Sequence, residues 1–250
     1  MMISIVVPMH NEAENVEAMV AEIAEATQGF AAREAILVDD GSSDDTAKLI
    51  AEQQAQHAWL RLVQHPKAGG QSAAVHSGVR LAKGDVICTL DGDLQNPPAE
   101  IPNLVAPFLA DGASANLGLV AGQRVKRQDT AAKKWASKAA NAIRAWMLND
   151  DTRDTGCGLK AFRREAFLAL PYFNHMHRYL PALFARDGWD VAHVDVSHRE
   201  RGGGRSKYTN LGRAMVGVHD LLGVAWLIKR GKTARPVEPP RPGSEIDAAQ

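Results

Sequence analysis

Short apolar runs alternate with amphipathic patterns along the first hundred residues. Four runs have the continuous hydrophobic character of strands buried on both faces, and they cover residues 3–7, 35–39, 60–64 and 86–90. Pro8 closes the first run, and Asn11 then provides an N-cap for a helix. The apolar face of this helix consists of Val16, Met19, Val20 and Ile23. Strands that alternate with helices in this way predict an α/β fold with a mostly parallel, right-handed, doubly wound sheet between helices.

The second half of the chain continues the pattern with longer helices. We expect helices over 98–111, 131–148 and 211–229 and strands over 117–122 and 191–198. Pro102 and Pro107 fall inside the first of these helices and favour an interrupted one. The prolines and scattered charges after Thr233 predict a disordered tail over 233–250.

Two of the predicted helices carry both aromatic and basic residues. The helix over 131–148 has Trp135 and Trp146 beside several lysines and Arg144, so it is either an amphipathic packing element or a basic helix at a membrane interface. The helix over 211–229 contains His219 and Asp220 and is too short and too interrupted to span a bilayer. It either packs on the core or lies in the interface.

The composition fits one substantial core. The chain has 250 residues, of which 45% are hydrophobic and 23% charged, and its formal net charge is zero, so nothing indicates nonspecific nucleic-acid binding. Cys88 and Cys157 lie far apart with no Cys-x-x-Cys spacing, and Met1 leads almost directly into an apolar strand without a leader. Both features favour a reduced cytosolic compartment.

A cluster of oxygen ligands follows the fourth strand. Asp91, Asp93 and Gln95 alternate along the chain just before two prolines, so they fall at the carboxyl edge of the predicted sheet, where open α/β sheets bind ligands. Hard oxygen ligands suit Mg²⁺ or Mn²⁺. The alternative is a solvated acidic turn.

The turn after the second strand contains two further carboxylates. Asp39 and Asp40 precede a loop of small residues at a helix start, and Asp40 could accept a hydrogen bond from the imide of a uracil or guanine base. The alternative is a helix cap. A second loop, Ala68-Gly69-Gly70, lacks the Gly-x-Gly-x-x-Gly pattern, so a nicotinamide site is poorly supported.

Taken in order, four segments resemble the nucleotide-sugar half of family 2 glycosyltransferases with the GT-A fold. These segments are 6–12, 38–45, 84–85 and 90–98. The resemblance implies a single domain over 1–230, with a donor half to about 122 and an acceptor half from about 123. It also implies inverting transfer and a nucleoside-diphosphate sugar held by Pro8, His10, Glu12, Asp39, Asp40 and Asp91. Asp91, Asp93 and Gln95 would hold the divalent metal on the diphosphate.

The Leu-Gln-Asn-Pro-Pro extension after Asp93 resembles the dolichyl-phosphate mannose synthase and polyprenyl-phosphate sugar synthase branch. The stretch 154–164 resembles a Thr-Ser-Gly-Phe-Arg-Ala-Phe-Arg-Arg segment of the family, and the basic loop after 198 matches the branch at Arg201, Gly204, Ser206 and Lys207. Arg124 and Lys138 fall where the branch keeps cations. The resemblance implies catalytic roles for Asp93, Arg124, Arg201 and Lys207.

One expected group of many family members is missing. No catalytic Asp aligns near 175–181, where this chain has His177 and Arg178. A phosphate monoester has a second pKa of about 6, so a phosphate acceptor is largely dianionic at neutral pH and needs cations rather than a base. The residues expected to contact the acceptor phosphate are Lys138, His177, Arg178 and Ser206.

The sequence therefore predicts transfer of a sugar from GDP-mannose or a UDP-sugar to a polyprenyl phosphate. The expected location is cytoplasmic, with peripheral attachment to the inner face of the membrane. Transfer to a sugar hydroxyl during envelope polysaccharide or lipopolysaccharide synthesis is the alternative enzyme function, and a noncatalytic nucleotide-sugar binding module is the alternative of another class. The donor base, the sugar, the polyprenol and the oligomeric state stay open.

Overall fold

In the computed structural model, residues 1–124, 144–148, 150, 152–199 and 210–231 are described, with no side chains for 210–216. Seven strands of these residues form one sheet in the order β3-β2-β1-β4-β6-β5-β7. The strands are β1 (Ile3–Met9), β2 (Arg33–Asp39), β3 (Leu60–Gln64), β4 (Val86–Thr89), β5 (Leu117–Arg124), β6 (Lys160–Arg163) and β7 (Asp190–Val196). Only β6 runs antiparallel to its neighbours, β4 and β5. The predicted mostly parallel sheet is confirmed.

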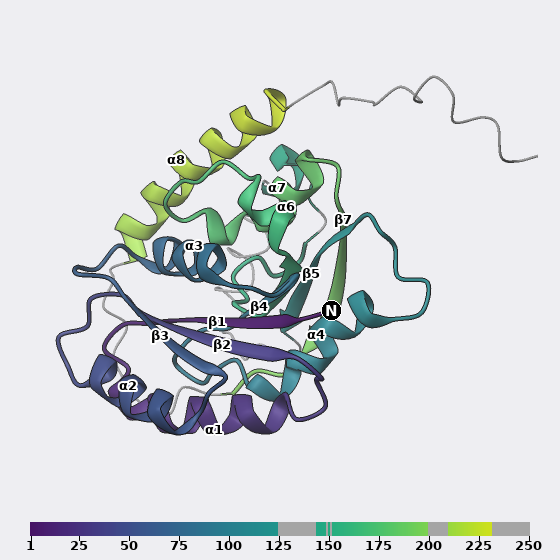
Figure 1. Cartoon of the computed structure of the whole chain (residues 1–250). Coiled ribbons are helices and arrows are strands. Elements are labelled where there is room, and N and C mark those ends of the chain that lie inside the picture. Colours follow the sequence, from purple (N-terminus) through teal and green to yellow (C-terminus); the bar gives the residue numbers. More distant parts are fainter. Residues whose placement is uncertain (125–143, 149, 151, 200–209, 232–250) are drawn as a thin grey trace, which may run out of the picture.

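Helices cover both faces of the sheet (Figure 1). They are α1 (Val16–Ala26), α2 (Thr46–Gln56), α3 (Gln71–Leu81), α4 (Ile101–Leu109), α6 (Arg164–Leu168), α7 (Leu180–Arg186) and α8 (Asn210–Lys229). Short 3₁₀ turns are η1 (Ala13–Asn15), η2 (Pro98–Glu100) and η3 (Met176–Arg178), and residues 144–148 are also helical. The two layers explain why the central strands are apolar throughout.

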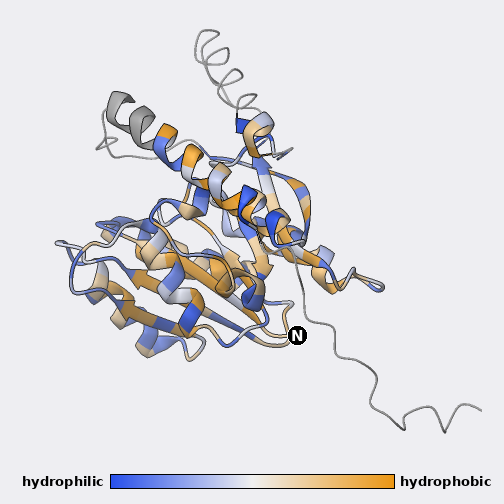
Figure 2. Ribbon diagram, turned by 90° about the horizontal axis from the view of Figure 1, so that it is seen from above, coloured by the Kyte–Doolittle hydropathy of each residue, from blue (hydrophilic) through white to orange (hydrophobic). Residues whose placement is uncertain are grey.

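Alternation along β1 divides the core into two parts. Ile5 and Val7 pack with α1, α2 and α4, whereas Val6 points to the other face and packs with α3 and the buried Phe162 of β6. The second face continues through α6 and α7 to Val224 of α8. Viewed from above, the hydrophobic residues gather between these layers (Figure 2).

Two local predictions near β1 are wrong. Pro8 does not close the strand, since β1 continues to Met9 and Pro8 lies in register with Val38 of β2. Asn11 does not cap α1: it has a left-handed backbone (φ 55°), and its Oδ1 accepts a hydrogen bond from the Ser43 N–H at 2.8 Å. Asparagine tolerates this conformation. Its side chain therefore joins two loops at the carboxyl edge of the sheet.

The helix expected over 98–111 is present as η2 followed directly by α4, and neither Pro102 nor Pro107 interrupts it. Pro102 occupies the first turn of α4, where its missing N–H costs nothing, and Pro107 lies inside the helix. β5 runs to Arg124 and so crosses the expected boundary between the donor and acceptor halves, while β6 of the second half inserts beside β4 of the first. The two halves share one sheet and form one domain.

The predicted basic helix over 131–148 is described only from Arg144 to Leu148. Arg144 is buried and pairs with Asp150, so it is not an interfacial cation, whereas Trp146 is 84% exposed. None of the helices described is long and apolar enough to cross a membrane. Residues 131–143, with Lys138, and the tail over 233–250 lie outside the described residues.

Candidate active site

The carboxyl ends of β1, β2 and β4 meet at one edge, as expected for parallel strands. A pocket of about 300 Å³ opens there, and its lining residues are Pro8, Met9, His10, Glu12, Asp40, Gln71, Asp91, Gly92 and Asp93. The structure thus brings together five of the six predicted nucleotide-binding residues and the predicted metal ligand Asp93. Asp39 does not line this pocket: it is buried, and its Oδ1 accepts a hydrogen bond from the Ser42 N–H at 3.2 Å.

The Asp40 carboxylate anchors the loop that precedes α3. Its Oδ1 accepts from the Gly69 N–H at 2.8 Å and lies 2.7 Å from His65 Nδ1, and its Oδ2 accepts from the Gly70 N–H at 2.7 Å. Burial acts to raise the pKa of this carboxyl, but the three partners outweigh burial and hold the pKa below its usual value. A carboxylate has about four acceptor positions, so these bonds leave little capacity for a base.

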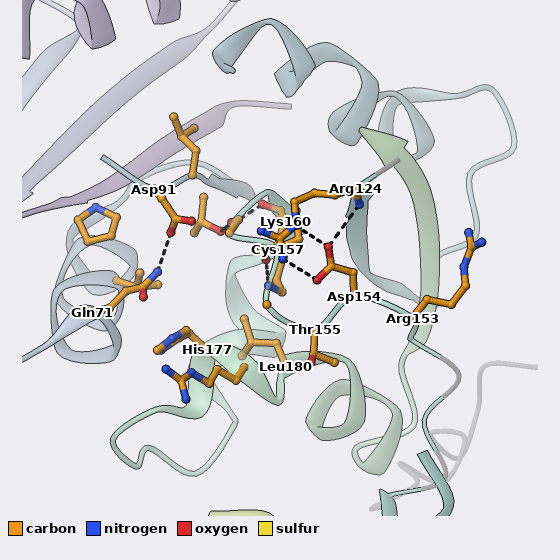
Figure 3. A pocket seen from close by; sticks show the side chains of 17 residues that line it. Gln71, Asp91, Arg124, Arg153, Asp154, Thr155, Cys157, Lys160, His177 and Leu180 are labelled. Atoms are coloured by element: carbon orange, nitrogen blue, oxygen red, sulfur yellow. Dashed lines mark hydrogen bonds and ion pairs between the residues drawn. The ribbon is translucent and has the colours of Figure 1, made fainter. Parts of the chain in front are cut away.

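Asp91 is held by two side-chain amides, and its contact with Gln71 is drawn in Figure 3. Gln71 Nε2 donates to its Oδ1 at 2.7 Å, and Asn96 Nδ2 donates to its Oδ2 at 2.8 Å. Burial, and then the charge of Asp93, raise the pKa of the Asp91 carboxyl to about 6. The negative charges of Asp91 and Asp93 repel each other, and a cation between the two carboxylates would relieve this repulsion.

The oxygen atoms of this pocket are suitable ligands for a hard divalent cation. Asp91 and Asp93 both face the smaller pocket, and the buried Oδ1 of Asn96 has no hydrogen-bond partner in the described part of the chain. Gln95 is less well placed, since its side chain lines neither pocket and its N–H donates to Asp93 Oδ1 at 3.2 Å. Among the described residues no group of three or more His, Cys, Asp or Glu gathers for a metal. The amides would therefore complete the ligand set.

A larger pocket of about 480 Å³ adjoins the first. Residues that line both pockets are Pro8, Gln71 and Asp91. The larger pocket adds the basic side chains Arg124, Arg153, Lys160 and Arg178, together with His177 and Asp154. Its described lining is consequently rich in cations, in contrast to the four carboxylates of the smaller pocket.

Arg124 is held in place by Asp154. Its Nε donates to Asp154 Oδ2 at 2.6 Å and its Nη2 to Oδ1 at 2.8 Å, a two-pronged ion pair that raises the pKa of the guanidinium (Figure 3). Sequence reasoning identified Arg124 but not its partner. Asp154 is the first residue of the stretch 154–164, which resembles a segment of the family, but nothing in the sequence pairs it with Arg124.

His177 cannot supply the positive charge expected of it. Its Nδ1 lies 2.7 Å from Ser72 Oγ at the start of α3, and burial, followed by the charges of Lys160 and Arg178, lowers the pKa of its imidazole to about 3. The ring is therefore neutral near pH 7. Arg178, the other residue predicted here, lines the larger pocket as expected.

Sequence reasoning missed Gln71, Arg153 and Lys160. No sequence motif points to Gln71, and Lys160 belongs to a segment with the sequence of an ordinary short strand. The predicted residues Lys138, Arg201, Ser206 and Lys207 lie outside the described residues, so their roles stay predictions.

A three-layer α/β domain with an acidic pocket at the carboxyl edge is a GT-A-like fold. Among solved structures, glucosyl-3-phosphoglycerate synthase from Mycobacterium tuberculosis, in complex with Mn²⁺ and uridine-diphosphate-glucose, superposes with a TM-score of 0.67. The match has 22% sequence identity and covers 90% of this chain and 79% of that chain, which shows the shared fold.

The chain belongs to glycosyl transferase family 2, since the model of that family matches residues 4–170. One similar curated protein is an undecaprenyl-phosphate 4-deoxy-4-formamido-L-arabinose transferase of Photorhabdus laumondii, 36% identical over 214 residues, or 83% of this chain. A protein of the same name from Pseudomonas savastanoi is 36% identical over 210 residues. The chain spans 63% of the length of the first relative and 60% of the second.

Proposed function

We propose that the protein transfers a sugar from a nucleoside diphosphate to a polyprenyl phosphate. The observation that carries this proposal is the pair of adjoining pockets of opposite charge, which share Pro8, Gln71 and Asp91. An acidic pocket suits a metal-bound diphosphate, and a basic pocket suits an acceptor that arrives as an anion. The reacting atoms would meet at the shared wall.

On the donor side, Asp91 and Asp93 would hold the divalent metal, and the unpartnered Oδ1 of Asn96 could add an amide ligand. When bound, the metal would neutralise charge on the departing diphosphate. A Mn²⁺ and UDP-glucose complex of a protein with the same fold supports this arrangement. Gln71 and Asn96 hold the Asp91 carboxylate in a fixed orientation before any ligand arrives.

On the acceptor side, the described lining offers no strong general base apart from Asp91, which would be occupied in holding the metal. Asp154 is engaged with Arg124, and a histidine with a pKa of about 3 is a weak base at neutral pH. A phosphate acceptor needs no base. One of its oxygens would attack the anomeric carbon as the bond to the nucleoside diphosphate breaks, and a single displacement inverts the configuration. The names of the curated relatives, which act on undecaprenyl phosphate, support this class of acceptor.

We place the protein at the cytoplasmic surface of a membrane, because its acceptor is a lipid. Three exposed apolar side chains of α8, Val218, Leu222 and Trp226, are spaced four residues apart and so lie along one face of the helix, which ends in Lys229. α8 runs along the outside of the helical layer (Figure 1). This exposed α8 stripe supports peripheral attachment that basic residues would strengthen.

The test is a transfer assay with purified protein, Mn²⁺ or Mg²⁺, and a panel of labelled nucleotide sugars that includes GDP-mannose and UDP-sugars. We expect a lipid-linked product with undecaprenyl phosphate and none with undecaprenol, which lacks the phosphate. A product on a neutral sugar hydroxyl at the same rate would refute the proposed acceptor. Binding of nucleotide sugar without any transfer would indicate a binding module.

A further inference from the structure

Lys160 reaches the centre of the site because β6 inserts against the direction of the sheet. As the first residue of β6, it pairs with Thr89 of β4 on one side and with Ala121 of β5 on the other. Asp91 follows Thr89 by two residues, and Arg124 follows Ala121 by three. Lys160 consequently lies between Asp91 and Arg124 (Figure 3).

The ammonium group of Lys160 is enclosed by protein, and the carboxylates whose charges act on it, Asp91 and Asp154, form no direct ion pair with it among the described residues. The residue is 4% exposed, and its Nζ donates to the Cys157 carbonyl oxygen. Among the described residues no carboxylate comes within ion-pair distance of Nζ. Lysine is almost never fully buried unless it is paired, because the lost hydration of the charge is costly. A site that retains such a residue would be completed by an anion from outside.

Two of the three guanidinium groups that line the larger pocket are already engaged. Arg124 forms its two-pronged pair with Asp154, and Arg153 donates to Gln123 Oε1 at 2.6 Å and lies 3.5 Å from Asp195 Oδ1. Their charges are partly compensated inside the protein. In the described part of the chain, the hydrogen-bond partner of the Lys160 ammonium is a neutral carbonyl rather than a carboxylate, so its charge is more available to a ligand.

We infer that Lys160 binds a phosphate group in the larger pocket, an inference that rests on the proposed function. An ammonium is a compact point charge with three donors, so it can keep its bond to Cys157 and donate to a phosphate oxygen as well. The phosphate is either that of the lipid acceptor or the diphosphate of the donor at the shared wall. Both ligands present phosphate oxygens to Lys160, and separate binding measurements with each ligand distinguish them.

The test compares Lys160→Met, which keeps length but removes charge, with Lys160→Arg, which keeps charge. Lys83→Met is the matched control, because Lys83 is exposed and precedes β4 at the opposite edge of the sheet. We would measure the KM for undecaprenyl phosphate and, by calorimetry, the dissociation constants of UDP with Mn²⁺ and of pyrophosphate. A charge-assisted hydrogen bond corresponds to a loss of about tenfold to hundredfold in Lys160→Met, with part of it restored in Lys160→Arg.

A raised acceptor KM with unchanged UDP affinity would assign Lys160 to the lipid phosphate, and the reverse would assign it to the donor diphosphate. Values within twofold of the parent for all three ligands would overturn the inference. The calorimetric measurements with UDP and with pyrophosphate do not depend on sugar transfer. They therefore test the inference even if no lipid product forms with any donor.

Thermal unfolding separates ligand binding from a structural role. Replacing a buried, poorly balanced charge by an apolar side chain of similar length is often neutral or stabilising, so Lys160→Met should melt at or above the parent Tm while phosphate binding falls. A lower Tm in Lys160→Met together with full phosphate binding by the folded fraction would mean that Lys160 only supports the fold.

Discussion

Gly158 lies directly against the Asp91 carboxylate. A Cβ at position 158 would come 2.3 Å from Oδ2 and 2.4 Å from Cγ of Asp91, which is closer than real Cβ contacts. On its other sides the carboxylate is held by Gln71 and Asn96. A side chain added at position 158 would therefore push the Asp91 carboxylate away from Gln71 and Asn96 and toward the pockets.

Gly158→Ala should abolish transfer by displacing Asp91. We expect at least a hundredfold fall in kcat/KM, with a thermal unfolding curve that still shows a cooperative fold. Gly29→Ala is the control, because no atom lies within 4 Å of the Cβ it would add. If Gly158→Ala kept more than half of the parent activity, the close contact would have no functional consequence.

Asp93→Asn should weaken the metal site without unfolding the protein. The substitution removes one of the two charges that face the smaller pocket, and we expect at least a tenfold loss of Mn²⁺-dependent UDP affinity by calorimetry. Chelation with EDTA should abolish transfer by the parent protein. Asp111→Asn, in an exposed turn, serves as the control. Unchanged Mn²⁺-dependent affinity in Asp93→Asn would remove Asp93 from the metal site.

Asp40→Asn should lower both stability and nucleotide affinity. The amide cannot accept all the hydrogen bonds of Gly69, Gly70 and His65, and the cost is about 1–3 kcal/mol at pH 7 by urea unfolding. Because the folded pKa of Asp40 is lowered, its contribution is present above the unfolded pKa and disappears as the pH falls through the folded pKa. The difference between parent and variant should accordingly shrink in acid. Loss of stability with unaltered UDP and GDP affinity would limit Asp40 to holding the loop.

His177→Asn should change the pH dependence of stability rather than that of catalysis. The folded pKa of about 3 lies below the unfolded value of 6.5, so between these values the unfolded chain binds more protons than the folded one. The free energy of unfolding therefore decreases as the pH is lowered through that window. The effect is on the order of 1 to 2 kcal/mol between pH 7 and pH 5, and it should be missing in His177→Asn. The measurement is denaturant unfolding at both pH values.

If His177 were instead the general base, its replacement would remove the acidic limb of the pH-rate profile. We expect that limb to be the same in the parent and in His177→Asn. His57→Asn, at the end of α2, controls for the loss of a histidine as such.

Leu222→Glu and Trp226→Glu should weaken membrane attachment. These substitutions place charge in the exposed α8 stripe, and we expect several-fold less protein on sedimented vesicles that contain anionic lipid, with little change in Tm. Raising the salt concentration should weaken attachment of the parent as well. Leu109→Glu changes an exposed leucine on α4 and should have no such effect. Equal vesicle binding by all variants would exclude α8 as the contact surface.

The sequence by itself determined the elements and the residue types of the acidic pocket. Short continuous apolar runs bounded by turn residues favour strands covered on both faces, so the layered sheet could be predicted. Parallel strands then bring their carboxyl ends to one edge. Asp40, Asp91 and Asp93 could be expected together for that reason. Pro8 and Asn11 were assigned wrongly, because local propensity competes with strand pairing and loop contacts that lie 30 or more residues away.

Only the tertiary structure decided which charges are available. Lys160 reaches the site because β6 inserts antiparallel between β4 and β5, a pairing that no local pattern reveals. The charge of Arg124 is balanced by Asp154, and His177 is neutral because burial, far more than sequence, determines the pKa of an imidazole. Burial and ion pairing depend on contacts between distant segments, so the sequence could name the ionisable groups but could not assign their protonation or their partners.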